Sequence, residues 1–479
     1  MAGSVYRHGR QLQSVPGVGQ LSFDLKALIH SRKGENLALQ GENINPQFAR
    51  VLRLIGFDKV YVRGLGQYLY DEDGAEYLDM LAGYAVHNIG RNHPVVIEAL
   101  KDLMDSQPAT LVQMDAPLLA GLLAERLKEL TPQGLDTVYF TNSGTEGVET
   151  AIKFSRKKTR RPRTLFCGHS FHGLSNGSLS LNADESYRTG FDPLIPGCDK
   201  VPLNDAGALA AELLKEDVAA FVLEPVQGKG VFIADDEYLR KVRKLCSRHG
   251  TLLVFDEVQT GFGRTGRMFA MDHSGVEPDI LVLSKALSAG LVPVGAVLTR
   301  RSIYDGVFDS LDNCVVHSST FGQGAYAMGA GLAALHVLED EGIVENSRRM
   351  GELLLEGLQE LAGKFELISE VRGRGLMIAI ELGKPSSLKL KLGWKLARKM
   401  QKGLVAQAMV MSLLADHRIL AQVAGHDLEI IKLIPPLVIN ESDVGRFLEA
   451  FEAVLERSHR FPGPIWEFTT RLAKHALKR

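Results

Sequence analysis

The 479-residue chain is poor in the features that define several protein classes. It has only four cysteines, Cys167, Cys198, Cys246 and Cys314, which stand far apart without a Cys-x-x-Cys pair. This spacing argues against a structural zinc site and a disulfide framework, and no metal site is predicted. Reduced thiols fit a cytoplasmic protein, which is the location we expect. No apolar run approaches the ~20 residues of a membrane span, so no transmembrane segment is predicted.

The chain also lacks an excess of charge. Its 55 lysines and arginines nearly balance 57 aspartates and glutamates, for a net charge of −2, so we expect no nucleic-acid partner. Hydrophobic residues make up 45% and charged residues 23%, which is typical of a soluble globular protein with a sizeable core. The N-terminus lacks the apolar stretch of a secretory signal. We interpret residues 1–45 as an N-terminal arm.

Short apolar runs separated by charged, helix-like stretches dominate the middle of the chain. Strands that are buried on both faces and joined by helical crossovers form a mostly parallel α/β sheet. We therefore predict a large α/β domain over 95–345, and a smaller α/β domain from 46–94 and 346–462. The expected strands of the large domain are 137–140, 164–167, 219–223, 252–255, 280–283 and 294–298.

Three local patterns in the flanking regions predict further elements. Tyrosine-rich segments on either side of 71–74 predict a hairpin, because Asp73-Gly74 suits a turn with positive φ. Leucines between 118 and 130 recur with helical spacing, and Asp115 is expected to cap that helix. Beyond about residue 345 helices prevail, and 371–382 and 429–433 are expected to be strands.

Polar residues follow four of the predicted strands. Ser143-Gly144-Thr145 opens a helix after the first, and Glu224, Asp256 and Lys285 follow later ones. Ligands of open parallel sheets bind at the carboxyl ends of the strands, so we expect these groups to meet in one crevice. A lone buried Asp or Lys usually means a structural ion pair, but four such groups make that reading improbable.

Each of these groups can bind or react with a different part of the same small molecule. A helix start with free N–H groups and hydroxyls holds a phosphate dianion, although Ser-Gly-Thr alone is often only a helix cap. Asp256 can pair with a protonated ring nitrogen, and Lys285 can form a Schiff base once its pKa is lowered. Together they describe a site for pyridoxal phosphate (PLP). His172 either places its imidazole over the cofactor ring or is a core histidine.

Several segments resemble the class III aminotransferases, PLP enzymes of fold type I. The resemblance runs from about residue 40 to 455, and the layout is most similar to that of putrescine, ornithine and acetylornithine aminotransferases. It rests on the segments 140–146 (FTNSGTE), 170–173 (SFHG), 223–228 (LEPVQG), 255–266 (FDEVQTGFGRTG), 283–287 (LSKAL) and 317–322 (HSSTFG).

This resemblance implies roles for individual residues. Lys285 would form the internal aldimine and shuttle the proton between substrate Cα and cofactor C4′, while Asp256 would salt-bridge the pyridine nitrogen. Thr320 would reach the phosphate of the neighbouring subunit's cofactor, so the active unit would be a homodimer with shared active sites. The phosphate would be held by Ser143, Gly144 and Thr145, the ring would contact Phe171 and Gln259, and Glu224 would orient residues beside the cofactor.

The sequence departs from the family at two positions that handle carboxylates. Many members have an arginine before the Pro-Pro strand, where this chain has Lys432, and some have a glutamate where it has Lys229. Two ammonium groups without an acid between them would repel each other, lowering one pKa or attracting an anion. Either one substrate is a primary amine, diamine, ω-amino compound or aldehyde, or Lys432 still binds a carboxylate while Lys229 points to solvent. Tyr84 and Met114 are expected near the substrate.

We therefore predict transamination between such an amino donor and a 2-oxo acid or aldehyde. The alternative is another PLP reaction on the same scaffold, namely that of an aminomutase, racemase, lyase or decarboxylase. A silent binding protein is disfavoured because the chemical residues are all present.

Bases also gather, without acids, at 153–163, 389–402 and 471–479, the last within a basic amphipathic extension, 463–479. They are either solvated helix faces or a docking surface for an anionic carrier protein or lipid headgroups.

Overall fold

The computed structural model describes residues 23–387, 403–425 and 429–459, together with 390–391, 394–395 and 398. The chain divides into two units, one ending at Val60 and the other beginning at Tyr61. The predicted extension 463–479 lies outside the described residues, as do Lys389, Lys399 and Lys402 of the second basic window. Among the residues that are described, no helix has both the length and the apolar character needed to cross a bilayer.

The first unit contains three short helices. They are α1 (Leu25–Ser31), α2 (Asn36–Asn43) and α3 (Pro46–Ile55). The Asn45 side chain caps α3 by accepting a hydrogen bond from the Phe48 N–H at 3.0 Å. The helix ends at Gly56, whose φ of 72° is the left-handed conformation that glycine adopts without strain.

The second unit begins with the predicted hairpin. Strands β2 (Tyr68–Asp71) and β3 (Glu76–Asp79) pair antiparallel, and Gly74 in the turn has a φ of +80°. The Asp71 carboxylate accepts hydrogen bonds from two N–H groups of the turn, which fixes its shape. Strand β1 (Tyr61–Leu65) extends the sheet on one side, and β13 (Ile419–Leu420) pairs parallel to β3 on the other.

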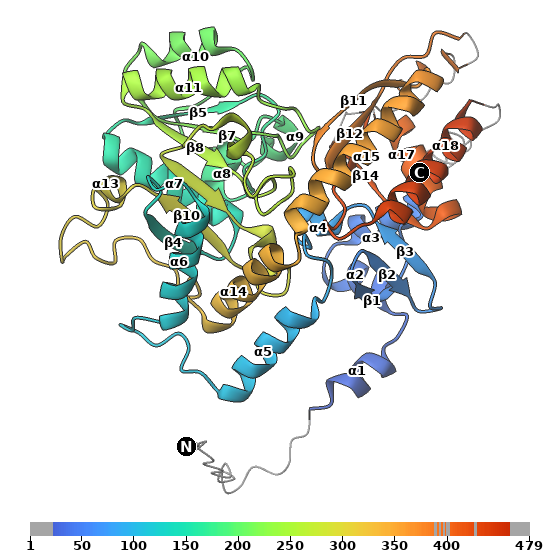
Figure 1. Cartoon of the computed structure of the whole chain (residues 1–479), viewed down its shortest axis with the longest axis horizontal. Helices are drawn as coiled ribbons and strands as arrows, with labels where there is room; N and C mark the ends of the chain where they lie inside the picture. The colour runs from blue at the N-terminus through green and yellow to red at the C-terminus, as the bar shows by residue number, and fades with distance from the viewer. Residues whose placement is uncertain are drawn as a thin grey trace, which may run out of the picture. The chain divides into compact units, whose positions relative to one another are not determined.

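A seven-stranded sheet forms the centre of this unit (Figure 1), with the strand order β4-β10-β9-β8-β7-β5-β6. Every strand predicted from the apolar runs is present, and the mostly parallel sheet is confirmed. Only β10 runs antiparallel to its neighbours. The sequence pattern missed β6, whose residues Cys-Asp-Lys-Val form no apolar run. The strands are β4 (Thr137–Thr141), β5 (Arg163–Cys167), β6 (Cys198–Val201), β7 (Val218–Leu223), β8 (Leu252–Asp256), β9 (Ile280–Leu283) and β10 (Gly295–Thr299).

Both faces of this sheet are buried. Helix α7 (Gly144–Thr159) packs its apolar side on one face, where Val148 and Phe154 meet alternate residues such as Val254 and Val282. The residues between them, such as Phe255 and Leu281, are equally buried on the other face. Because neither face meets water, the strands are continuous apolar runs, and polar residues are left to their ends.

Helix α6 (Leu118–Leu130) follows the predicted leucine spacing, but its predicted cap is wrong. The residue at the cap position is Pro117, and the Asp115 carboxylate accepts from the adjacent Ala116 N–H. Asp115 stands two residues too early to reach the free N–H groups of the first turn. The remaining helices of this region are α4 (Ala82–Ala85), α5 (Pro94–Ser106), α8 (Asn176–Ser180), α9 (Glu185–Arg188), α10 (Ala206–Leu213), α11 (Asp236–His249), α12 (Met271–Ser274), η1 (Lys285–Ser288), α13 (Arg301–Tyr304) and α14 (Ala325–Asp340).

The C-terminal part contains an antiparallel sheet with the order β11-β12-β15-β14. Residues 371–382, expected as strand, belong to a hairpin of two strands, and 429–433 corresponds to β15. Helices α15 (Ile343–Lys364) and α17 (Leu404–His417) pack on this sheet, and α18 (Glu441–Ser458) packs on both helices. The strands are β11 (Ile368–Arg374), β12 (Met377–Leu382), β14 (Gln422–Val423) and β15 (Ile430–Leu433).

Candidate active site

A cavity of about 690 Å³ lies at the carboxyl ends of β4, β7, β8 and β9. The structure brings together there the predicted site residues except Thr320 and Met114, which are both exposed and do not line the cavity. The predicted residues that line the cavity are Tyr84, Ser143, Gly144, Thr145, Phe171, His172, Glu224, Lys229, Asp256, Gln259, Lys285 and Lys432.

Asp256 ends β8 and is held from two sides. One carboxylate oxygen lies 2.7 Å from His172 Nδ1, and the other accepts from the Val258 N–H at 3.0 Å. Burial opposes a charge on the His172 ring, but the hydrogen bond to Asp256 outweighs it and raises the pKa of His172. The His172 side chain is fully buried. His172 supports Asp256 and also lines the cavity, and its contact with the cofactor ring stays a prediction.

Lys285 follows β9 and begins the single turn η1. Its φ is +43°, a strained value for a residue with a side chain. Burial lowers the pKa of the Lys285 ammonium, although the carboxylates of Asp256 and Glu224 act in the opposite direction. An amine with a lowered pKa is the form that attacks a carbonyl carbon, so the site favours Schiff-base chemistry.

The N-terminus of α7 opens towards the cavity. The Ser143 hydroxyl caps the helix by accepting from the Glu146 N–H at 3.3 Å. A Cβ on Gly144 would lie 2.7 Å from a methyl group of Val258, so the close approach requires glycine. The free N–H groups at this helix end suit a phosphate dianion.

The hydroxyl of Thr145 belongs to a cluster that the sequence analysis missed. It lies 2.6 Å from the hydroxyl oxygens of both Ser175 and Ser178, at the start of α8. The three hydroxyls add donors beside the α7 N-terminus. The signal available in the sequence was the serine-rich stretch that follows Phe171-His172-Gly173, but serine is common in loops.

Glu224 connects two backbone segments at the cavity. Its two carboxylate oxygens accept from the N–H groups of Phe171 at 3.0 Å and Gly228 at 2.7 Å. The carboxyl group is buried, and burial raises the pKa of Glu224. Glu224 therefore orients the backbone of both segments, and its role beside the cofactor stays a prediction.

Lys229 has an acidic partner that the sequence analysis did not foresee. Its ammonium forms an ion pair with Asp184, and it lies 4.5 Å from the centre of the Tyr187 ring. Partial burial opposes the charge on Asp184, but hydrogen bonding to Lys229 lowers the pKa of Asp184 to about 2. The expected absence of an acid is wrong. The alternative in which Lys229 points to solvent is also wrong, since its side chain is 11% exposed.

Lys432, in contrast, has only neutral hydrogen-bond partners among the described residues. Its ammonium donates to the Gly228 carbonyl at 2.8 Å and lies 3.4 Å from Gln259 Oε1. Burial, and after it the charge of nearby Lys285, lowers the pKa of Lys432 to about 7. The main cause of this lowering is burial, and repulsion by Lys229, on which the sequence-based expectation rested, contributes least.

Tyr84 forms part of the cavity wall near Lys432. Lys432 Nζ lies 5.9 Å from the centre of its ring, and the Tyr84 hydroxyl accepts a hydrogen bond from the Gln422 amide at 2.7 Å. Tyr84 has a φ of +65°, which is strained for a tyrosine. Gln422, in β14, is a further cavity residue that no sequence motif indicated.

Comparison with known proteins gives consistent results. Residues 56–455 match the family described as "Aminotransferase class-III". The chain is 34% identical over 480 residues to aminotransferase PigE of a Serratia species, covering 93% of this chain and 56% of that protein. It is 37% identical over 439 residues to putrescine aminotransferase of Pectobacterium atrosepticum, covering 88% and 89%. The chain therefore spans little more than half the length of PigE.

A solved structure extends the similarity to the fold. Ornithine aminotransferase from Toxoplasma gondii, crystallised with partial occupancy of PLP at its active site, superposes with a TM-score of 0.77. The two sequences are 30% identical, and the match covers 92% of this chain and 100% of that one.

The residues of the cavity fit PLP chemically. Asp256 is a fixed carboxylate that can hold a protonated ring nitrogen, since two of its lone pairs remain for a further partner. Lys285 has the lowered pKa that condensation with an aldehyde requires, and the α7 N-terminus can hold the phosphate. Because the family match covers most of the chain and the cavity suits the family's cofactor, we conclude that the protein belongs to the class III aminotransferases, PLP-dependent enzymes that catalyse transamination.

Proposed function

We propose that the chain transfers the amino group of a primary amine, diamine or ω-amino compound to a 2-oxo acid or aldehyde. Lys285 is the proposed catalytic residue. The observation that carries the proposal is the position of Lys285, whose ammonium pKa is lowered, in one cavity with Asp256. PLP, when bound there, supplies an aldehyde and an electron-withdrawing ring.

The residues of the chain divide the work as follows. Asp256 holds the proton on the ring nitrogen, and His172 fixes the orientation of Asp256. The free N–H groups of α7, with the hydroxyls of Ser143 and Thr145, bind the phosphate. With PLP bound, the free amine of Lys285 would remove the proton from the donor carbon that carries the amino group.

Three further residues of the cavity have proposed positioning roles. Glu224 holds the backbone of Phe171, and the Phe171 ring would contact the ring of the bound cofactor. Gln259 is proposed to approach the ring hydroxyl. Its amide donates to the Tyr84 carbonyl at 3.3 Å, which orients the side chain at the cavity wall.

The donor class follows from Lys432. Arginine grips a carboxylate through two parallel hydrogen bonds, whereas lysine offers a single point charge. With a pKa of about 7, Lys432 carries its charge only part of the time at neutral pH. A donor without an α-carboxylate does not need this charge. The named relatives point the same way, because putrescine and ornithine both carry a terminal amino group.

A donor screen tests the proposal. Diamines, ω-amino acids and long-chain amines are compared with α-amino acids, each with pyruvate and with 2-oxoglutarate as acceptor. We expect kcat/KM for the terminal amines to exceed that for α-amino acids by at least about tenfold, the cost of roughly one lost charge-assisted hydrogen bond. A decisive advantage for α-amino acids contradicts the donor class. Loss of the aldehyde absorbance with donor alone distinguishes transamination from an aminomutase, racemase, lyase or decarboxylase.

We also propose a homodimer with shared active sites. The segments 110–118 and 311–325 are joined by a hydrogen bond between Ala325 N and Thr110 Oγ1 at 3.0 Å. They expose large apolar side chains, with Met114 95% and Leu311 92% exposed, which favours a protein interface. Thr320 lies in this surface and is proposed to reach the partner's cofactor phosphate. Light scattering that gives the mass of one chain contradicts the dimer.

The proposed location is the cytoplasm. Cys167, Cys198, Cys246 and Cys314 are all free thiols, two of them buried. Free thiols in these positions are consistent with a reducing compartment.

A further inference from the structure

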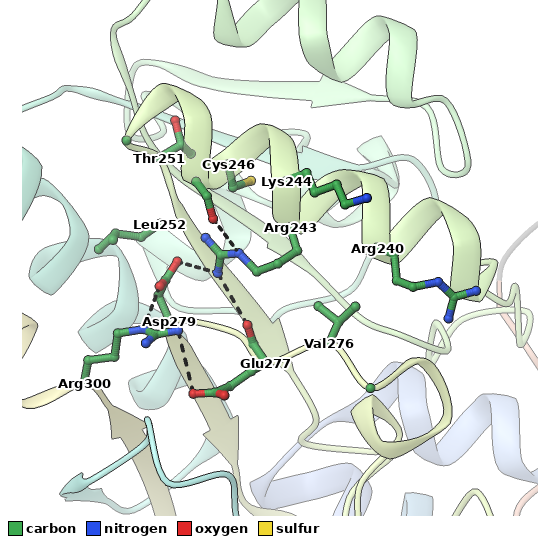
Figure 2. A pocket seen from close by; sticks show the side chains of 13 residues that line it. Arg240, Arg243, Lys244, Cys246, Thr251, Leu252, Val276, Glu277, Asp279 and Arg300 are labelled. Carbon is green, nitrogen blue, oxygen red and sulfur yellow. Dashed lines mark hydrogen bonds and ion pairs between the residues drawn. The ribbon is translucent and has the colours of Figure 1, made fainter.

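A second cleft, of about 760 Å³, lies at the amino ends of the parallel strands β8 and β9, and Figure 2 shows the side chains that line it. The C-terminal half of α11, the first residue of β8 and the segment before β9 form its walls, and Arg300 reaches it from the end of β10. Asp256 and Lys285 stand at the other ends of β8 and β9. We call this second site the α11 cleft.

The α11 cleft is rich in cations. Arg240, Arg243 and Lys244 stand at helical spacing on one side of α11, and Arg300 lies across from them. The acids that line it are Glu277 and Asp279. Four permanent or near-permanent positive charges therefore face two negative ones.

Asp279 fixes the position of two of these arginines. Its carboxylate oxygens lie 2.8 Å from Arg243 Nη1 and 2.9 Å from Arg300 Nε. It also accepts from the Leu253 N–H at 2.8 Å, which ties the group to β8. Both guanidinium groups are thereby held in place before any ligand arrives, which reduces the entropy lost on binding.

Within the described part of the chain, Arg240 and Lys244 form no close ion pair, although Arg240 helps Lys241 to lower the pKa of Glu237. Arg240 donates to the Ser274 carbonyl at 3.2 Å, and Lys244 is exposed. The basic window at 153–163 is different. Its arginines and lysines donate largely to carbonyl groups and, at Arg163, to three carboxylates. The fold uses most of that window, whereas in the α11 cleft the exposed Lys244 forms no ion pair with a described residue and Arg240 donates only to a carbonyl.

The negative end of α11 does not cancel this charge. Arg161 donates to the His249 carbonyl at 2.6 Å, and the Thr251 N–H donates to the Cys246 carbonyl at 3.0 Å. These hydrogen bonds cap the carbonyl groups of the last turn. The cations along the side of the helix therefore set the sign of the potential in the cleft.

We propose that the α11 cleft binds a small anion with a diphosphate group. Arginine pairs geometrically with phosphate oxygens through its forked N–H groups. Two adjoining phosphates supply the charge that Arg240, Lys244 and the fixed Arg243 and Arg300 can share. Among the described residues that line the cleft none is aromatic, so recognition rests on the phosphates and not on stacking of a base.

Calorimetric titration of the PLP-loaded enzyme with inorganic pyrophosphate tests this proposal, because PLP already fills the phosphate site of the cavity. We expect one pyrophosphate per chain, with orthophosphate binding more weakly. Loss of two charge-assisted hydrogen bonds in the Arg240→Ala/Lys244→Ala variant weakens the Kd by about tenfold or more. ADP, which adds a base and ribose, is expected to bind no more tightly than pyrophosphate.

Lys241→Ala is the matched control. Lys241 stands on the same helix, but it pairs with Glu237 at 2.7 Å and does not line the cleft. Its removal is expected to leave the Kd unchanged, and Lys244→Glu, at an exposed site, gives an independent weakening. Turnover without pyrophosphate stays at the wild-type level in all three variants. Absence of binding, equal binding by the double variant, or much tighter binding of ADP overturns the proposal, whatever the donor screen shows.

Discussion

The two sites at opposite ends of the parallel strands, the cavity and the α11 cleft, differ in the kind of cation that they contain. At the carboxyl ends of the strands, the cavity holds lysines, and burial lowers the pKa of both Lys285 and Lys432. At the amino ends, the α11 cleft holds arginines that stay charged and share Asp279. Lysine can lose its proton and then react, whereas arginine cannot. The comparison indicates that burial at the cavity favours neutral, reactive lysine, whereas the ion pairs of Asp279 at the cleft serve stability, and anion binding at the cleft is our proposal.

Of the substitutions at these two sites, Lys285→Ala should reduce turnover most. General-base transfer contributes about 10²–10⁴-fold, and the covalent link to PLP is lost too, so kcat should fall by at least about 10³-fold. Borohydride reduction followed by mass spectrometry should find no PLP on residue 285. Circular dichroism matching that of the wild type excludes unfolding as the cause. Turnover within tenfold of the wild type would contradict the assignment of Lys285 as the catalytic residue.

Asp279→Asn, in the α11 cleft, should lower the stability of the fold and leave catalysis unchanged. It removes the shared charge and leaves Arg243 and Arg300 without their buried partner. Breaking a buried pair typically costs about 3–5 kcal/mol in the free energy of unfolding, and the half-exposed Arg300 places this case at or below the lower end. Denaturant unfolding measures the loss. At a temperature where the variant is folded, kcat should stay unchanged, and a selective loss of kcat would contradict the division between the two sites.

Lys432→Arg places a permanent cation in the cavity, and so tests whether the charge at this position governs 2-oxoglutarate binding. In the wild type, Lys432 is protonated below its pKa of about 7 and neutral above it. KM for 2-oxoglutarate should therefore rise as the pH increases through 7. Arginine should remove this dependence and lower KM at pH 8 by about tenfold, while KM for a diamine changes little. A pH-independent KM in the wild type would contradict the role of Lys432.

Asp184→Asn should have the smallest effect. It leaves the Lys229 ammonium unpaired near Lys432, and a second free cation disfavours the charge on Lys432. The pH at which 2-oxoglutarate binding weakens should move down by less than about one unit. Lys229→Ala, which removes that cation, should move it up. Shifts of equal sign in the two variants would refute the coupling.

The central sheet was predictable because burial on both faces produces continuous apolar runs. The direction of β10 was not, because it depends on the connection to β9. That connection has too few residues for the crossover that a parallel strand needs, so the chain returns antiparallel. Edge strand β6 was missed because its Asp199 and Lys200 are exposed. The domain boundaries at 95 and 345 stay predictions.

The candidate site shows the same division. Asp256 and Lys285 were predicted because each closely follows an apolar run, and the carboxyl ends of parallel strands lie together. Recognising them needs only the local sequence. Asp184, Ser178 and Gln422 come from distant loops and a short strand, where nothing in the sequence marks their approach to the cavity. Long-range contacts of this kind depend on the whole fold, so local sequence patterns do not reveal them.

Strand β9 runs from the α11 cleft to the cavity through four buried residues, a span of roughly 13 Å. Asp279 stands immediately before it, and Lys285 follows its end after one intervening residue, Ser284. An inserted or deleted residue in this strand would exchange its two faces. It would also turn the Lys285 side chain away from the cavity or draw Asp279 out of its salt bridges. The segment therefore has a fixed length as well as a fixed composition, and alignments of relatives should show no gaps within it.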